Sequence, residues 1–323
     1  MIPRIQIAFF EKTKNALQSD NELYSNLNEQ RIKQFLKGTM KSENIQIGFN
    51  LNFQWLKGRS FSSVIDPLIA AGLSVIEVHL DFRFPQIADH LEYLCKQAAN
   101  SGLGISFHGP YLDPPFMVGF ARENKLALKS QWQPVADLIN RYTSTNLIRT
   151  EMVLHGSHGP DADMSNLLDD TVQISQWILE QCPELFIGIE NLPTPRNPSN
   201  LVKFGEDRDS VLKVVNQVDH PRCGITWDMG HCVRNHILDL PSQEWVKKVV
   251  HVHVHDVDEA RQDHWPLNIG RTPYLDWIKY LIANNFCGTI TAELTGDLYR
   301  DWTQDYIDAQ LLATIQKIKE AIC

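Results

Sequence analysis

From Ile45 onward, short apolar runs alternate with longer segments whose apolar residues recur at helical spacing. Runs of this length are typical of β-strands, and segments such as QIADHLEYLCKQAANSG are typical of amphipathic helices. The eight runs are residues 45–51, 73–80, 103–108, 148–155, 185–190, 223–228, 248–255 and 288–294. Alternation of strand and helix predicts a parallel sheet, and eight pairs predict a closed (β/α)8 TIM barrel.

The order of residues within single runs predicts which face of each strand points into the barrel. In the run 248–255, valines and histidines alternate, so the two residue types lie on opposite faces of the strand. In the run 288–294, threonines and Glu293 alternate with apolar residues in the same way. The apolar face must pack against the helices, so we expect the polar face to point inward.

Four polar residues lie at or near the ends of successive runs in the second half of the chain. They are Glu190, Asp228, His253 and Glu293, separated by 38, 25 and 40 residues. A strand with its crossover helix occupies about 30 or more residues. The spacing therefore predicts one polar side chain at the carboxyl end of each successive strand.

Three carboxylates and one imidazole are a ligand set that suits a divalent metal, with Mn, Mg, Co and Zn as candidates. One ion is the main expectation, and two or three ions remain alternatives. The competing interpretation is that each residue is an isolated polar group held by loop hydrogen bonds. For four residues on consecutive strands this is disfavoured, because buried carboxylates without partners are costly.

Four further histidines follow predicted strands: His108, His155, His231 and His264. They could ligate a second or third ion, bind substrate hydroxyls, or act as general acids and bases. The competing interpretation for each is packing beneath a loop. His251 is interpreted as structural or peripheral. Trp227, Trp265 and Phe107 are expected to pack in the core, with apolar walls of a ligand site as the alternative.

The length and the first residues predict the domain organisation. The chain has 323 residues, of which 43% are hydrophobic, and one barrel is commonly about 250 residues. Residues 1–43 are mostly polar and lie outside the alternating pattern. We expect a helical N-terminal extension over 1–43, packed on a barrel formed by residues 44–323.

Charge and cysteine usage narrow the classes of partner. The net charge of −9 gives no long-range attraction to nucleic acid or to anionic membranes. Six dispersed cysteines without a C-x-x-C pair indicate reduced thiols. No signal-peptide pattern or membrane-spanning run is present, so the expected location is the cytoplasm.

Ordered motifs in the sequence resemble the xylose isomerase-like superfamily. They are HGPYL, LHGSH, IENLP, WDMGH, HVHVHD, HWPLNIG and AELTG, and they cover about residues 45–320. That superfamily joins sugar isomerases and epimerases with endonuclease IV-type apurinic/apyrimidinic endonucleases. The resemblance implies a metal-dependent TIM barrel.

Residue by residue, the resemblance implies that Glu190, Asp228, His253 and Glu293 are the ligand set shared across the superfamily. His108, His155, His231 and His264 match the additional ligands of the trinuclear endonucleases. Tyr111 and Leu112 match their DNA-intercalating residues. Gln262 stands where these enzymes carry a carboxylate ligand, with Asp263 displaced by one position, which counts against a third ion.

Three functions compete for this site. The favoured one is a divalent-metal-dependent sugar, sugar-phosphate or polyol isomerase or epimerase. In it, Glu190 and Glu293 transfer a proton through an enediolate, and Tyr111, Trp265 and Arg271 belong to the substrate-binding loops. A dehydratase would use the same parts. The alternatives are an endonuclease IV-type phosphodiesterase acting on abasic DNA and a non-catalytic metal-binding barrel. The expected partner is a small carbohydrate-like molecule, and a homo-oligomer remains an alternative.

Overall fold

The structure is a computed structural model. It describes residues 45–51, 55–56, 58–80, 86–110, 125–143, 149–160, 162–194, 201–268 and 270–323. The predicted N-terminal extension over 1–43 lies outside these residues, and so do Tyr111 and Leu112.

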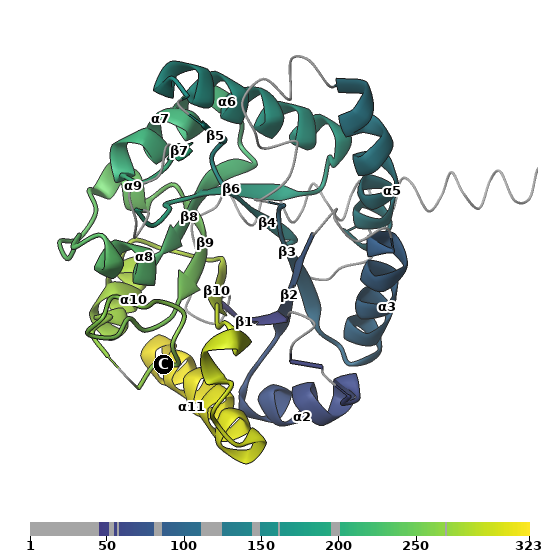
Figure 1. Ribbon diagram of the computed structural model, residues 1–323, viewed down its shortest axis with the longest axis vertical. Coiled ribbons are helices and arrows are strands. Elements are labelled where there is room, and N and C mark those ends of the chain that lie inside the picture. Colours follow the sequence, from purple (N-terminus) through teal and green to yellow (C-terminus); the bar gives the residue numbers. More distant parts are fainter. Residues whose placement is uncertain are drawn as a thin grey trace, which may run out of the picture. The chain divides into compact units, whose positions relative to one another are not determined.

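Eight parallel strands close into a barrel, in the order β1-β10-β9-β8-β6-β4-β3-β2 (Figure 1). The barrel strands are β1 (Gln46–Leu51), β2 (Val75–His79), β3 (Gly104–His108), β4 (Glu151–Leu154), β6 (Phe186–Glu190), β8 (Cys223–Asp228), β9 (Val249–Val254) and β10 (Thr289–Ala292). Each strand coincides with one of the predicted runs. The predicted (β/α)8 barrel is confirmed.

Helices surround the barrel and follow its strands (Figure 1). The helices are α2 (Phe61–Ala71), α3 (Ile87–Asn100), α5 (Lys125–Thr143), α6 (Met164–Gln181), α7 (Arg208–Val218), α8 (Met229–Arg234), α9 (Gln243–Val246), α10 (Tyr274–Ala283) and α11 (Gln304–Ile322), with a 3-10 helix, η2 (Gly296–Tyr299). None of the described helices is long and apolar enough to cross a membrane.

Two short strands that the apolar pattern did not predict lie in the loops beyond the barrel. They are β5 (His158–Pro160), after β4, and β7 (Leu201–Lys203), after β6, and they pair antiparallel. This pairing ties together two of the loops that follow the carboxyl ends of barrel strands.

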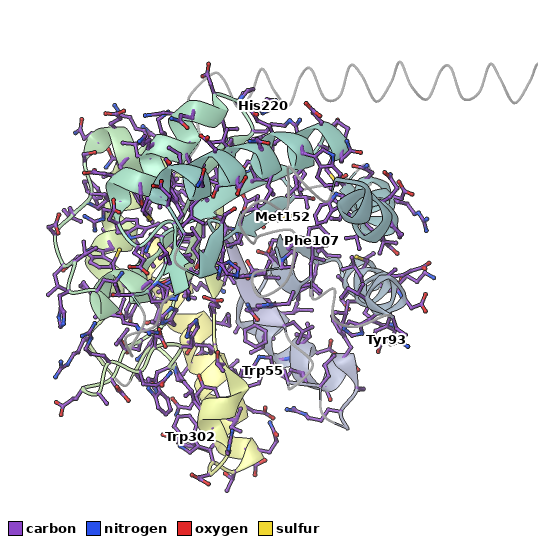
Figure 2. All side chains as sticks on the ribbon, turned by 45° about the horizontal axis from the view of Figure 1, so that its top comes forward. Trp55, Tyr93, Phe107, Met152, His220 and Trp302 are labelled. Carbon is purple, nitrogen blue, oxygen red and sulfur yellow. The ribbon has the colours of Figure 1, made fainter. Side chains whose placement is uncertain are left out.

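The core lies between the strands and the helices, where the outward-facing strand residues are buried. Phe107 and Met152 are register partners on β3 and β4, exposed by 1% and 0% (Figure 2). Trp227 on β8 stacks on Trp277 of α10 at 5.2 Å between ring centroids and meets Trp245 of α9 edge-on. Phe107 and Trp227 are therefore core residues and do not form walls of a sugar site.

The inward face of the barrel is unusually polar. TIM-barrel interiors are generally filled by branched apolar side chains. Here Glu77, Ser106, Thr226, His251 and Thr291 are all buried on inward-facing strand positions. Space for this layer is tight, because a Cβ atom on Gly188 of β6 would lie 2.2 Å from Thr226 Oγ1.

Candidate functional site

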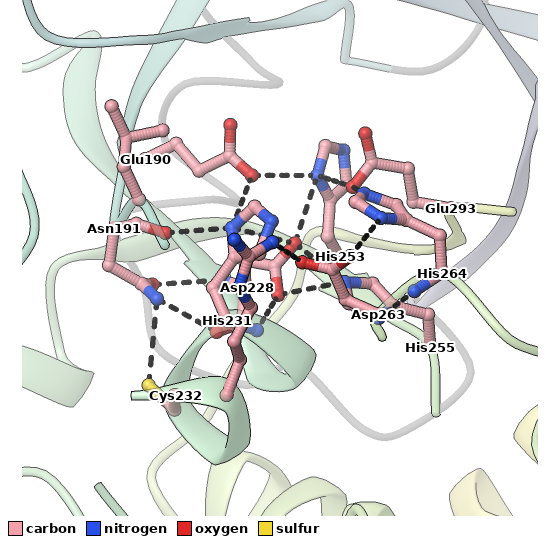
Figure 3. Close-up of polar contacts among 12 residues, drawn as sticks. Glu190, Asn191, Asp228, His231, Cys232, His253, His255, Asp263, His264 and Glu293 are labelled. Carbon is pink, nitrogen blue, oxygen red and sulfur yellow. Dashed lines mark hydrogen bonds and ion pairs between the residues drawn. The ribbon is translucent and has the colours of Figure 1, made fainter. Parts of the chain in front are cut away.

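The four residues predicted at strand ends lie together at the carboxyl end of the barrel. Glu190 ends β6, Asp228 ends β8, His253 lies on β9, and Glu293 directly follows β10. All four are buried, and each offers a ligand atom within 4.8 Å of the others. We call these four residues the central cluster. Figure 3 shows Glu190 and Glu293 on opposite sides of the His253 ring.

His253 is at the middle of the central cluster. Its Nδ1 atom lies 3.1 Å from Glu190 Oε1, 3.1 Å from Glu293 Oε2 and 3.8 Å from Asp228 Oδ2. Its Nε2 atom lies 3.1 Å from each carboxylate oxygen of Glu77 on β2. One ring nitrogen therefore faces the other members of the cluster, and the other faces the barrel interior.

The electrostatics of the central cluster favour a bound cation. Burial raises the pKa of the Glu190 and Glu293 carboxyls, but nearby imidazoles outweigh it and hold both pKa values well below the usual range. Burial lowers the pKa of His253, yet the surrounding carboxylates raise it well above its usual range. Within the described part of the chain, no lysine or arginine pairs with these carboxylates. The donor set therefore fits a divalent ion, whose charge would replace that of a protonated histidine.

A backbone carbonyl fixes the tautomer of two of the additional histidines. The Nδ1 atom of His108 lies 2.9 Å from the Gly109 carbonyl, and that of His231 lies 3.0 Å from the Asn191 carbonyl. A carbonyl oxygen only accepts, so each Nδ1 must carry the proton. In the neutral rings both Nε2 atoms then keep a lone pair, which is the arrangement that metal-ligating histidines commonly have.

His108 and His155 form a neighbouring group with Glu190. His155 Nε2 lies 2.7 Å from Glu190 Oε2, and His108 Nε2 lies 3.8 Å from the same oxygen. The three residues offer ligand atoms within 4.8 Å of one another. This group could hold a second ion beside the central cluster, with Glu190 shared between the two.

His231, His255 and His264 form a third group, but neither ring nitrogen of His255 is available to bind a metal. Its Nδ1 accepts the backbone N–H of His264 at 2.9 Å, so its Nε2 carries the proton and lies 3.1 Å from Asp228 Oδ1. His255 therefore orients Asp228 and is not a ligand. His264 lies 3.4 Å from Glu293 and 3.3 Å from Asp263. These carboxylates outweigh its burial and raise the pKa of His264 to about 10.

The loop around Gln262 adds no uncompensated carboxylate to this third group. Gln262 Nε2 donates to Asp263 Oδ1 at 3.2 Å. The other Asp263 oxygen pairs with the Arg234 guanidinium. The Asp263 charge is thus already compensated by a cation of the chain, as well as by His264. The geometry favours one or two ions over three.

The residues predicted for the substrate-binding loops have different surroundings. Tyr111 lies outside the described residues. Trp265 packs on Tyr299 and Trp302, and its Nε1 donates to Asp258 at 3.1 Å. Arg271 is well exposed and pairs with Glu259 at 3.3 Å. The structure does not bring Arg271 into the central cluster.

Three buried residues lie beneath the central cluster, and two of them were missed from the sequence. Glu77 and Glu151 lie inside apolar runs and received no role. His251, interpreted as structural or peripheral, is fully buried between them. The strand parity that placed His253 inward was the available signal, since His251 is two residues before it and shares its face.

Gly230 is required by the position of the His255 ring. A Cβ atom there would lie 2.0 Å from His255 Cε1, in the first turn of α8. We expect Gly230→Ala to displace His255 and to lower the free energy of unfolding by about 1–3 kcal/mol, the usual cost of overpacking. Chemical denaturation would measure this loss. Equal stability of Gly230→Ala and the parent would contradict the prediction.

The fold and the central cluster together define a (β/α)8 barrel with a carboxylate and imidazole cluster at the carboxyl ends of its strands. Comparison with known families identifies the chain further. The sequence profile of the xylose isomerase-like TIM barrel family matches residues 65–315, so the chain belongs to that family.

Individual relatives are distant in sequence. An uncharacterized protein of Methanocaldococcus jannaschii, MJ1311, is 24% identical over 216 residues, which cover 63% of this chain and 69% of that protein. Among solved structures, D-psicose 3-epimerase from Clostridium cellulolyticum H10 matches with a TM-score of 0.62 and 12% identity, covering 86% of this chain and 99% of the other. The zinc-containing IOLI protein matches with a TM-score of 0.60 and 13% identity, covering 86% and 97%. At these identities the solved structures establish the shared fold.

Proposed function

We propose that this protein is a divalent-metal-dependent sugar isomerase or epimerase. It would move a proton on the carbon next to a carbonyl group through an enediolate. The observation that carries the proposal is the placement of Glu190 and Glu293, each 3.1 Å from His253 Nδ1 on opposite sides of the ring (Figure 3). Two carboxylates on two sides of one centre are suited to remove a proton from one face of a substrate and return one to the other.

The central cluster would hold the ion through Glu190, Asp228, His253 and Glu293, and Mn, Mg, Co and Zn all suit these ligands. When bound, the ion would orient the oxygens of an α-hydroxy carbonyl compound and lower the pKa of the proton to be moved. His255 would keep the Asp228 carboxylate in position through its Nε2–H. His264, 3.4 Å from Glu293, would be placed to bind a substrate hydroxyl.

The relatives support a carbohydrate-like substrate. A fold shared with D-psicose 3-epimerase is compatible with proton transfer on a ketose, and the zinc of the IOLI protein is compatible with metal dependence. Sugars, sugar phosphates and polyol-derived ketones are the candidate substrates. Residues of the loops around the mouth would select among them, since specificity in TIM barrels lies in these loops.

Deuterium exchange across a range of sugars tests the proposed reaction and identifies the substrate at the same time. The metal-loaded protein would be incubated in D₂O with a panel of ketoses, aldoses and their phosphates. We expect the proton signal next to the carbonyl to disappear for at least one compound, together with the appearance of an isomer. No exchange across the panel with the fully loaded protein would contradict the proposal.

A phosphodiesterase acting on abasic DNA is the second candidate. It is favoured by the group of His108, His155 and Glu190, which could bind a second ion. It is disfavoured by the net charge of −9, because phosphate contacts supply most of the affinity for DNA. It is also disfavoured by the pairing of Asp263 with Arg234. Chelator-sensitive nicking of an abasic oligonucleotide, without deuterium exchange on sugars, would establish it in place of the isomerase.

A further inference from the structure

A continuous chain of charged side chains runs through the barrel interior beneath the central cluster. It begins with Arg149, just before β4, and continues through Glu151, His251 and Glu77 to His253. Glu151, His251, Glu77 and His253 are all exposed by 1% or less. Charges at such positions are stable only when paired and hydrogen-bonded. These side chains can therefore be buried only as a paired network.

The contacts along the chain are all within hydrogen-bonding distance. Arg149 Nε donates to Glu151 Oε1 at 2.7 Å, and Glu151 Oε2 lies 2.7 Å from His251 Nδ1. His251 Nε2 lies 3.0 Å from Glu77 Oε2, and both Glu77 oxygens lie 3.1 Å from His253 Nε2.

The hydrogen-bond partners determine which histidine nitrogens in this network carry protons. Ionised carboxylates only accept hydrogen bonds, so each ring nitrogen that faces one must carry a proton. His251 faces a carboxylate on both sides and is therefore an imidazolium. With Arg149 it supplies two positive charges, which match the negative charges of Glu77 and Glu151. In the metal-free protein the same rule places a proton on both ring nitrogens of His253, since Nε2 faces Glu77 and Nδ1 faces Glu190 and Glu293. A divalent ion in the central cluster would displace only the Nδ1 proton, because Glu77 holds the proton on Nε2.

We propose that Glu77 is a positioning residue that holds His253 in its Nε2–H tautomer and aims Nδ1 at the metal of the central cluster. His251, Glu151 and Arg149 fix the Glu77 carboxylate in place. This inference rests on the proposed metal dependence and adds residues to the same site. Carboxylates that accept from a metal-ligating histidine generally change metal affinity by 10–100-fold when they are removed.

A second possibility for the same side chains is a separate ion bound by Glu77, His251 and His253, whose ligand atoms lie within 4.8 Å of one another. The contacts argue against it. Both nitrogens of His251 point at carboxylates, so His251 has no lone pair for a metal. An ion at this place would also have to displace the Glu151 contact at 2.7 Å.

The test is the affinity of the full chain for Zn²⁺ and Mn²⁺, measured by competition with a chromophoric chelator. We expect Glu77→Gln to bind each ion about 10–100-fold more weakly than the parent. The matched control is Ser106→Ala. Ser106 is the register partner of Glu77 in the same buried layer, and its hydroxyl forms no hydrogen bond within the described residues. This control should change the affinity less than about 3-fold.

A readout independent of affinity is the hydrogen bond of the His253 Nε2–H, observed through the ring ¹⁵N and ¹H shifts of the zinc-loaded protein. With zinc on Nδ1 the proton lies on Nε2 in both proteins, but only in the parent does it donate to a carboxylate, so its proton signal should move upfield in Glu77→Gln. Because Glu77→Gln leaves the His251 charge unmatched, the double variant Glu77→Gln, His251→Gln provides a second test with a neutral interior. It should show the same loss of affinity.

The outcomes separate this inference from the proposed function. If the parent takes up no divalent ion, the proposed function itself fails. If the parent binds one and Glu77→Gln or the double variant binds it equally well, only the role of Glu77 is overturned. Loss of a second, separate ion in Glu77→Gln would overturn it too, in favour of a deep metal site.

Discussion

Replacing Glu190 by glutamine should abolish the proposed proton transfer and leave the barrel folded. An amide can neither take up a proton nor compensate a divalent charge, so the variant would lose both proposed roles of this residue. Loss of general acid–base catalysis alone typically lowers the rate by about 10²–10⁴-fold. The measurement is the rate of deuterium exchange or isomerisation of the substrate found in the panel.

The stability of the same variant tests whether Glu190 serves activity or folding. Glu190 ends a strand at the barrel mouth, and it faces two other buried carboxylates within the central cluster. Its carboxylate also pairs with His155 at 2.7 Å and His253 at 3.1 Å, so the metal-free variant should be less stable than the parent but should keep a cooperative unfolding transition. Thermal unfolding of the metal-free proteins measures this.

The matched control for both measurements is Glu180→Gln, the same chemical change at an exposed position near the end of α6. It should change neither activity nor unfolding. Retained activity in Glu190→Gln would contradict the catalytic role. Loss of its cooperative unfolding transition would show that Glu190 is needed for the fold.

The barrel could be predicted from the sequence because each strand has two faces with different surroundings. In β6, Ile187 and Ile189 pack against helices, while Gly188 and Glu190 face inward. The same alternation recurs along the chain, and eight repeats leave few architectures other than a closed barrel. The central cluster could also be predicted, because its four residues lie at or next to strand ends. Parallel strands of a barrel have all their carboxyl ends at the same mouth.

The contacts of Glu77, Glu151 and His251 beneath the central cluster could not be predicted in the same way. Glu77 meets His253 across 176 residues, and Glu151 meets His251 across 100 residues. A charged residue within an apolar run indicates an inward position, but its partner depends on the register and stagger of the closed barrel. The tautomers of His108, His231 and His255 likewise depend on carbonyl and amide groups that only the folded loops bring close.

Removal of the metal should destabilise the protein strongly. At a free metal concentration about 1,000 times the dissociation constant, binding adds about 4 kcal/mol to the free energy of unfolding. For a domain of this size this corresponds to roughly 10 °C in melting temperature. The physical reason is that Glu190, Asp228 and Glu293 lose the cation that compensates their buried charges. Thermal melts with metal and with excess chelator measure the difference.

The size of this difference should depend on pH, because a proton on His253 partly replaces the metal. The pKa of His253 in the folded, metal-free protein is raised well above the unfolded value of 6.5. Its protonation therefore stabilises the fold fully below about pH 6.5, and this contribution is lost as the pH rises through the folded pKa. As the pH rises through the folded pKa of His253, the free energy of unfolding of the metal-free protein should fall, whereas that of the metal-loaded protein should not.

The carboxylates act in the opposite direction at low pH. The pKa values of Glu190 and Glu293 are lowered from 4.5, so their contribution is present above about pH 4.5 and is lost as the pH falls through the lowered values. The metal-free protein should thus be most stable between about pH 4.5 and 6.5. The gain from metal should grow as the pH rises above about 6.5, because protons compete less for the ligands. A gain that is constant over this range would show that His253 is not the group that exchanges a proton for the metal.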